Sequence, residues 1–189
     1  MSQKTDLRII KTRKNLYNTL ETLMKESPFE EIKVNDICNK AMINRSTFYA
    51  HYTDKYELLQ EYINSLKDNL LTKLDGNNNI KNTKEYYLEL IKLLLEHFEE
   101  KKETYHYMMI NNKNSITMDI IYDVINKGII KQIEESTDFE GAKVPSSIIS
   151  LFYLGAVINI CIEYLKYNNK YTKKQIIEYI NILIPDNLY

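Results

Sequence analysis

Residues that interrupt helices are scarce in this chain, and their scarcity limits the folds that it can adopt. Only four glycines and three prolines occur among 189 residues. An all-β chain needs many turn residues, and an α/β chain usually needs a glycine-bearing loop at each crossover. The sequence therefore predicts an all-α fold, in which long helices are joined by short connections.

Apolar residues recur at three- and four-residue steps, which is the period of amphipathic helices. We expect a three-helix domain over residues 1–59 and a second helical domain over 60–189, joined by a long fourth helix that ends before the turn-forming stretch 76–79. The expected helices span approximately residues 6–26, 34–41, 44–52, 54–75, 83–98, 105–110, 116–135, 146–168 and 172–185.

The arrangement of residues 34–52 predicts a helix-turn-helix. Apolar side chains at i, i+3, i+4 and i+7 from Val34 define a short helix, and Met42 and Ile43 leave room only for a tight turn. Asn44 is a suitable N-cap for the next helix. In that helix Phe48 and Tyr52, four residues apart, can face the core together.

The opposite face of this helix carries side chains suited to reading DNA. Arg45 can donate a bidentate pair of hydrogen bonds to guanine, whereas Ser46 and Thr47 are short enough for the backbone to approach the base edges. Tyr49 and His51 can donate to phosphates. A second helix with such a face is the element that enters the major groove in helix-turn-helix proteins.

Two stretches carry a resemblance to a known family, residues 29–38 (FEEIKVNDIC) and 44–59 (NRSTFYAHYTDKYELL). Together they resemble the second, third and fourth helices of the TetR family of bacterial regulators, and the match runs without a gap from about Thr12 to Leu59. Met42 departs from the glycine usual at the family's turn, and Tyr52 replaces the commoner phenylalanine.

The resemblance implies a transcriptional regulator that binds double-stranded DNA. It places Arg45, Ser46 and Thr47 at or near bases, and Lys33 and Lys55 on phosphates at the starts of the second and fourth helices. The resulting candidate DNA-binding residues are Lys33, Asn44, Arg45, Ser46, Thr47, Tyr49, His51 and Lys55.

For the C-terminal part the resemblance implies an effector pocket and a dimer interface. Aromatic and methionine side chains suit a small-molecule pocket, although the same residues also fill ordinary helical cores. The candidate pocket residues are Phe98, Tyr105, Tyr107, Met108, Met109, Tyr122, Phe152 and Tyr153. The candidate dimer residues, on the last two expected helices, are Gly155, Ala156, Ile160, Ile176, Ile180 and Leu183.

The functional expectation is a homodimeric repressor that a small-molecule effector releases from a palindromic operator. A TetR-type activator and a helical module that binds protein instead of DNA are the alternatives. The sequence shows no phosphate-binding loop, nucleophile elbow or metal-ligand spacing, so we expect neither an enzyme nor a cofactor or metal site. His97 and His106 have no metal-ligand partner at three or four residues' distance.

Charge and hydropathy indicate a cytoplasmic protein. Residues 1–60 hold ten basic and eight acidic side chains, and the remainder holds fifteen and eighteen, so the excess of positive charge lies in the expected DNA-binding part. No apolar leader is evident at the start. The longest apolar run, 148–162, is interrupted by polar residues and is shorter than the ~20 residues that span a bilayer. Cys38 and Cys161 are expected to be reduced core residues.

Overall fold

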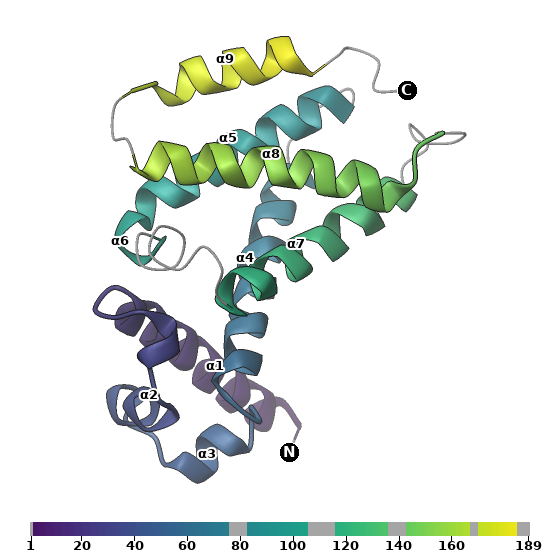
Figure 1. Ribbon diagram of the computed structural model, residues 1–189. Helices are drawn as coiled ribbons and strands as arrows, with labels where there is room; N and C mark the ends of the chain where they lie inside the picture. Colours follow the sequence, from purple (N-terminus) through teal and green to yellow (C-terminus); the bar gives the residue numbers. More distant parts are fainter. Residues whose placement is uncertain (1, 76–82, 106–115, 136–142, 167–169, 185–189) are drawn as a thin grey trace. The chain divides into compact units, whose positions relative to one another are not determined.

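The computed structural model describes residues 2–75, 83–105, 116–135, 143–166 and 170–184. Within these ranges the regular elements are all helical (Figure 1), which confirms the predicted fold class. The helices are α1 (Ser2–Met24), the 3-10 turn η1 (Phe29–Glu31), α2 (Val34–Ala41), α3 (Arg45–Tyr49), α4 (Lys55–Asp75), α5 (Thr83–Glu100), α6 (Lys102–Tyr105), α7 (Ile116–Glu135), α8 (Ser146–Lys166) and α9 (Lys173–Leu183).

The chain divides into two compact units. The first comprises Met1–Ile63 and Glu103–Ile121, and the second comprises Asn64–Lys102 and Tyr122–Tyr189. The division along α4 therefore falls after Ile63, whereas the sequence suggested a boundary after residue 59. One reason is that Tyr62 is still part of the first core: it is 6% exposed and its hydroxyl donates to Glu21 Oε2 on α1 at 3.2 Å.

The core of the first unit is formed where one face of α1 meets α2, α3 and the start of α4. Its fully buried side chains include Leu16, Leu20, Met24, Phe29, Ile37, Phe48, Leu58 and Leu59. Asn15 on α1 donates from Nδ2 to the carbonyl oxygen of Ala41 at 2.9 Å, so it satisfies one of the carbonyls left open at the end of α2. This contact joins α1 to the turn that precedes α3.

A polar cluster also joins the helices of the first unit. Glu61 Oε2 on α4 accepts hydrogen bonds from the hydroxyls of Tyr17 on α1, at 3.2 Å, and Tyr52, at 3.0 Å. The carboxylate lies 3.6 Å from Arg13 on α1. Burial is the largest cause that raises the pKa of both tyrosines, so both stay protonated and keep donating at neutral pH.

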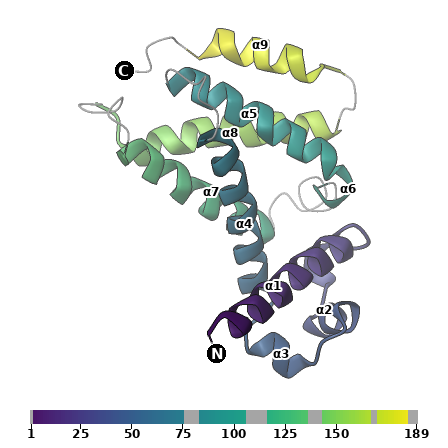
Figure 2. The ribbon, with the colours of Figure 1, turned by 180° about the vertical axis from the view of Figure 1, so that it is seen from behind.

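The second unit is built around α5, which packs against both α8 and α9 (Figures 1 and 2). Ile91 and Leu95 are buried on α5, and Ile158 and Cys161 are buried on α8. Thr172 caps α9 by accepting from the Gln175 backbone N–H at 3.2 Å, while the Gln175 side chain accepts from the Thr172 N–H at 2.9 Å. This reciprocal pair of hydrogen bonds is a capping box.

α8 combines an inward face with an unusually apolar outward face. It is the one helix among the described residues that is long and apolar enough to cross a membrane, and core helices of soluble proteins share this length and composition. Ile149, Leu154 and Ile158 are buried on it, whereas Ile148 and Phe152 are exposed.

Candidate nucleic-acid interface

The turn between α2 and α3 depends on an unusual backbone conformation at Met42. This residue has φ 55° and ψ 44°, in the left-handed region that glycine adopts most readily. It ends α2, because the N–H of Ile43 can then return to the carbonyl oxygen of Cys38 at 3.0 Å. The glycine usual in the resembled family is thus replaced without loss of the left-handed turn, and the Met42 side chain is 92% exposed.

α3 begins immediately after this turn. Asn44 occupies the N-cap position with an extended backbone, and its carbonyl accepts from the N–H groups of Thr47 and Phe48 at 2.9 and 3.2 Å. Its side chain makes no capping hydrogen bond and is exposed. The expected position of the N-cap is confirmed, while the amide is directed to solvent instead of to the helix backbone.

Burial separates the two faces of α3. Phe48 is 0% and Tyr52 2% exposed, which places both in the core as predicted. Arg45, Ser46 and Tyr49 are exposed. Thr47 and His51 are partly exposed at the edges of the same face. The two aromatic side chains therefore hold α3 against the domain while its polar face stays accessible.

Arg45 and Tyr49 form a pair on the exposed face. Arg45 NH2 lies 3.3 Å from the Tyr49 hydroxyl, and the guanidinium carbon lies 5.7 Å from the centre of the Tyr49 ring. The hydrogen bond to Tyr49 raises the pKa of Arg45, which remains cationic. The pairing holds a bidentate donor beside a phenol that can contact a phosphate.

Lys55, the first residue of α4, is held differently from the other candidate residues. Its Nζ donates to three backbone carbonyl oxygens, those of Phe29 at 2.9 Å, Glu30 at 2.7 Å and Ile32 at 2.8 Å. It also lies 4.8 Å from the centre of the Phe29 ring. Burial lowers the pKa of Lys55, and the charge of Glu30 opposes that shift.

An ammonium group has three donors, and the structure directs all three of Lys55 to the segment before α2. The phosphate contact expected for Lys55 would require at least one of these hydrogen bonds to break. Lys33, by contrast, has an exposed side chain, and its backbone N–H donates to Asp36 Oδ2 at 2.9 Å in the first turn of α2.

The start of α4 carries an acidic cap. Asp54 Oδ1 accepts from the backbone N–H groups of Tyr56 and Glu57 at 2.8 and 2.9 Å. Glu57 Oε2 reaches back to the N–H and the hydroxyl of Thr53 at 2.6 and 2.7 Å. These hydrogen bonds lower the pKa of Glu57. The caps fix the short segment between α3 and α4.

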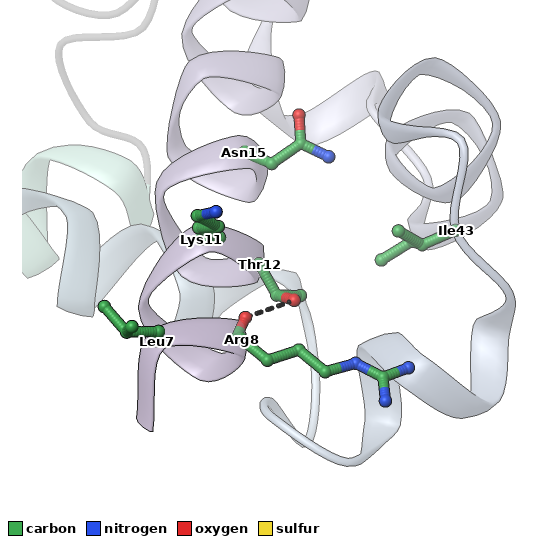
Figure 3. A pocket seen from close by; sticks show the side chains of 6 residues that line it. All are labelled: Leu7, Arg8, Lys11, Thr12, Asn15 and Ile43. Carbon is green, nitrogen blue, oxygen red and sulfur yellow. Dashed lines mark hydrogen bonds between the residues drawn. The ribbon is translucent and has the colours of Figure 1, made fainter. Parts of the chain in front are cut away.

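A pocket that the sequence did not indicate opens beside the α2–α3 turn (Figure 3). It lies between α1 and Ile43, and Arg8 and Asn15 extend from α1 toward the side on which Ile43 lies. The lining residues are Leu7, Arg8, Lys11, Thr12, Asn15 and Ile43. The sequence feature that could have indicated this pocket is the local excess of basic residues near the start of α1.

Comparisons with known proteins agree with this geometry. The family model described as "Bacterial regulatory proteins, tetR family" matches residues 17–62. A second TetR model, described as "Transcriptional regulator C-terminal region", matches residues 87–186, more than half of the chain. The chain belongs to the TetR family. It is accordingly a DNA-binding transcriptional regulator, and residues 34–52 are its TetR helix-turn-helix.

Individual relatives of the chain are distant. Over 178 residues the chain is 26% identical to DhaS, the dhaKLM operon transcriptional activator of Lactococcus lactis, a match that covers 92% of this chain and 89% of DhaS. It is 39% identical to the regulator YxbF of Bacillus subtilis over 62 residues, 32% of this chain but only 16% of YxbF. A TetR-family structure from Syntrophomonas wolfei has a TM-score of 0.70 at 17% identity, covering 92% of both chains.

The candidate effector residues fall into four groups. Phe98 and Tyr105 are buried, and Tyr122 and Tyr153 are partly exposed. Phe152 is 71% exposed, because it points away from the core of the second unit. Tyr107, Met108 and Met109 lie outside the described residues, as does His106. Tyr87, which is not among the candidate pocket residues, stacks on Tyr153 with ring centres 5.1 Å apart.

The candidate dimer residues also differ in how far they are exposed. Ala156 and Leu183 are exposed, and nothing lies within 4 Å of a methyl group added at Gly155. Ile160 is partly exposed. Ile176 and Ile180, however, are 7% and 6% exposed within the protomer, because this face of α9 is the one that packs inward. The exposed apolar side chains near the end of α9 are Tyr179, Ile182 and Leu183.

Proposed function

We propose that this TetR-family regulator binds a palindromic operator as a homodimer, with α3 of each protomer in one of two successive major grooves. The observation that carries the proposal is the division of α3 into a buried aromatic face and an exposed face with Arg45, Ser46 and Tyr49. Asn44, Thr47 and His51 extend the reading face, and Lys33 adds a phosphate contact.

Binding to DNA from the region around the gene tests this proposal. We expect a specific, salt-sensitive complex whose half-site centres lie about 34–36 Å apart or somewhat more. Arg45→Ala should cost ~1–3 kcal/mol and relax the base preference at one position of each half-site. A variant that binds every sequence as the wild type does would contradict the assignment of α3 as the reading helix. A preference for a protein partner over duplex DNA would favour the helical interaction module instead.

Exposed apolar side chains on α8 and on α9 support the homodimer. Ile148, Leu151 and Phe152 are 55%, 53% and 71% exposed, and Ile182 and Leu183 are 74% and 77% exposed. Apolar surface of this extent marks an interaction site. In a twofold dimer the same residues of the two copies would face each other, so that each copy would cover the other's exposed apolar side chains. Phe152 is better suited to this interface than to the effector pocket.

We also propose that a small, partly apolar effector binds in the second unit and weakens operator binding. The stacked Tyr87 and Tyr153 rings and the buried Phe98 provide aromatic surface for such a molecule. By linkage, the effector must bind the DNA-bound dimer more weakly by the same factor, ~5–150-fold for a coupling of 1–3 kcal/mol. A stabilising compound with equal affinity in both states cannot be the effector.

Repression is the proposed mode of regulation, and activation is the second candidate because the relative DhaS is an activator. A promoter fusion with and without the regulator separates them: deletion raises expression for a repressor and lowers it for an activator. In either mode the chain acts in the cytoplasm and without catalysis.

A further inference from the structure

The first half of α1 concentrates positive charge. Residues 2–15 contain five basic side chains, those of Lys4, Arg8, Lys11, Arg13 and Lys14, and one acidic side chain, that of Asp6. Residues 16–31 reverse this balance, with four glutamates and one lysine. The modest excess of +2 over residues 1–60 therefore conceals a much stronger local excess at one end of α1.

Helix stability does not account for these cations. Arg8 and Lys11 are three residues apart, and so are Lys11 and Lys14, a spacing at which like charges destabilise a helix. The helix macrodipole disfavours a cation in the first turn of α1, where Lys4 lies, and it does not stabilise Arg8 or Lys11 farther along the helix. Among the residues whose side chains the structure describes, Arg13 has an acidic partner in Glu61, whereas no ion pair involves Arg8 or Lys11.

Arg8 and Lys11 line the pocket beside the α2–α3 turn (Figure 3). The other polar groups in its lining are the Thr12 hydroxyl and the Asn15 amide, and no carboxylate lines it. Ile43, on its opposite side, immediately precedes the N-cap of α3. This pocket, with two basic residues in its lining, and the reading helix thus belong to one unit and meet at this turn.

We propose that Arg8 and Lys11 bind the phosphodiester backbone of the operator beside the half-site that α3 reads. A DNA strand whose bases face α3 carries its phosphates past the neighbouring elements of the domain, and a pocket with two cations and no acidic residue is complementary to them. Leu7 and Ile43 give the pocket apolar edges that suit the deoxyribose carbons. This inference rests on the proposed role of α3 and adds a second contact element to it.

The salt dependence of operator affinity tests the contact. Arg8→Gln and Lys11→Gln should each lower the slope of log K against log salt by about one for each protomer bound. Lys14→Gln is the matched control, because it removes the same charge from an exposed position of α1 that does not line the pocket. Arg8→Lys should retain the slope. Thermal unfolding of each variant establishes that it is folded.

Ethylation interference locates the contact. Wild-type protein should be sensitive to ethylation of a phosphate that Arg8→Gln no longer senses. This inference is wrong if the salt slopes of Arg8→Gln and Lys11→Gln equal that of Lys14→Gln, or if the ethylation interference pattern of Arg8→Gln is the same as that of the wild type. The proposed role of α3 is unaffected by such a result as long as Arg45→Ala loses its base preference in the same assay. If Arg45→Ala also reads DNA as the wild type does, both this inference and the proposed role of α3 are wrong.

Discussion

Lys55 Nζ on α4 lies 2.8 Å from the carbonyl oxygen of Ile32, the residue that closes η1 ahead of α2. Two further carbonyls of the same segment, those of Phe29 and Glu30, accept from the same ammonium group. The lysine therefore ties the start of α4 to the approach to α2. A side chain in the position of a family phosphate contact is used here to hold the domain together.

Replacing Lys55 by methionine should lower the free energy of unfolding by about 1–3 kcal/mol, because a charged donor shared by three carbonyls is lost. The salt slope of operator binding should stay close to that of the wild type, since no phosphate contact is removed. Urea unfolding and a salt titration measure the two effects. Lys33→Met is the matched control and should show the opposite pattern, with unchanged stability and a smaller slope. A reduced slope with unchanged stability for Lys55→Met would show that Lys55 leaves the carbonyls to bind DNA.

Met42→Gly should stabilise the first unit by about 1 kcal/mol, because a left-handed conformation costs a side-chain-bearing residue about 1–2 kcal/mol and glycine almost nothing. Part of this gain is offset by the larger conformational freedom of glycine in the unfolded chain. Met42→Ala keeps the backbone strain and should be nearly neutral, because the methionine side chain is exposed. Denaturant midpoints compare the three proteins. A glycine variant no more stable than the alanine variant would contradict the positive φ at this position.

Glu57 should contribute a pH-dependent part of the stability. Its folded pKa lies below the ordinary value of 4.5 because Thr53 donates two hydrogen bonds to its carboxylate. The contribution is therefore complete above pH 4.5 and is lost as the pH falls from 4.5 through the lowered folded value. Glu57→Gln should be less stable than the wild type at pH 7, and the difference should close in acid. Denaturant midpoints from pH 7 to pH 3 measure it, and a gap that stays constant would refute the prediction.

Ala156→Arg should dissociate the proposed dimer, because it would place an unpaired charge on the apolar outward face of α8. Loss of the dimer should also sharply reduce operator affinity. Ser147→Arg, on the same helix but away from that face, is the control and should leave the assembly intact. Sedimentation velocity distinguishes the two. An Ala156→Arg protein that still sediments as a dimer would place the interface on another surface.

Most helices could be predicted closely because the signals that define them are local. The short helix expected over residues 105–110 is an exception, since α6 spans Lys102–Tyr105 and residues 106–110 lie outside the described ranges. Apolar spacing predicts the bounds 34–41 and 116–135. The starts of α4 and α9 lie one residue after the expected 54 and 172, because Asp54 and Thr172 cap these helices. α1 begins at Ser2, four residues before the expected start, because its basic first turns carry little apolar periodicity. Phe48 and Tyr52 were assigned to the core correctly, since their four-residue spacing admits no other common face.

The contacts between helices depended on the tertiary structure. Apolar spacing identifies one buried face of α9, but whether Ile176 and Ile180 pack against their own α5 or against a second copy depends on where that helix lies. In the same way a lysine at the start of α4 has the composition of a phosphate contact, and only the approach of η1 commits Lys55 to three carbonyls. The sequence by itself determined most of the helices and the family, and it predicted which side chains of α3 are exposed. The tertiary structure decided which polar groups are already satisfied within the protein, because a hydrogen bond between residues distant in the chain is created by the fold and has no periodicity in the sequence.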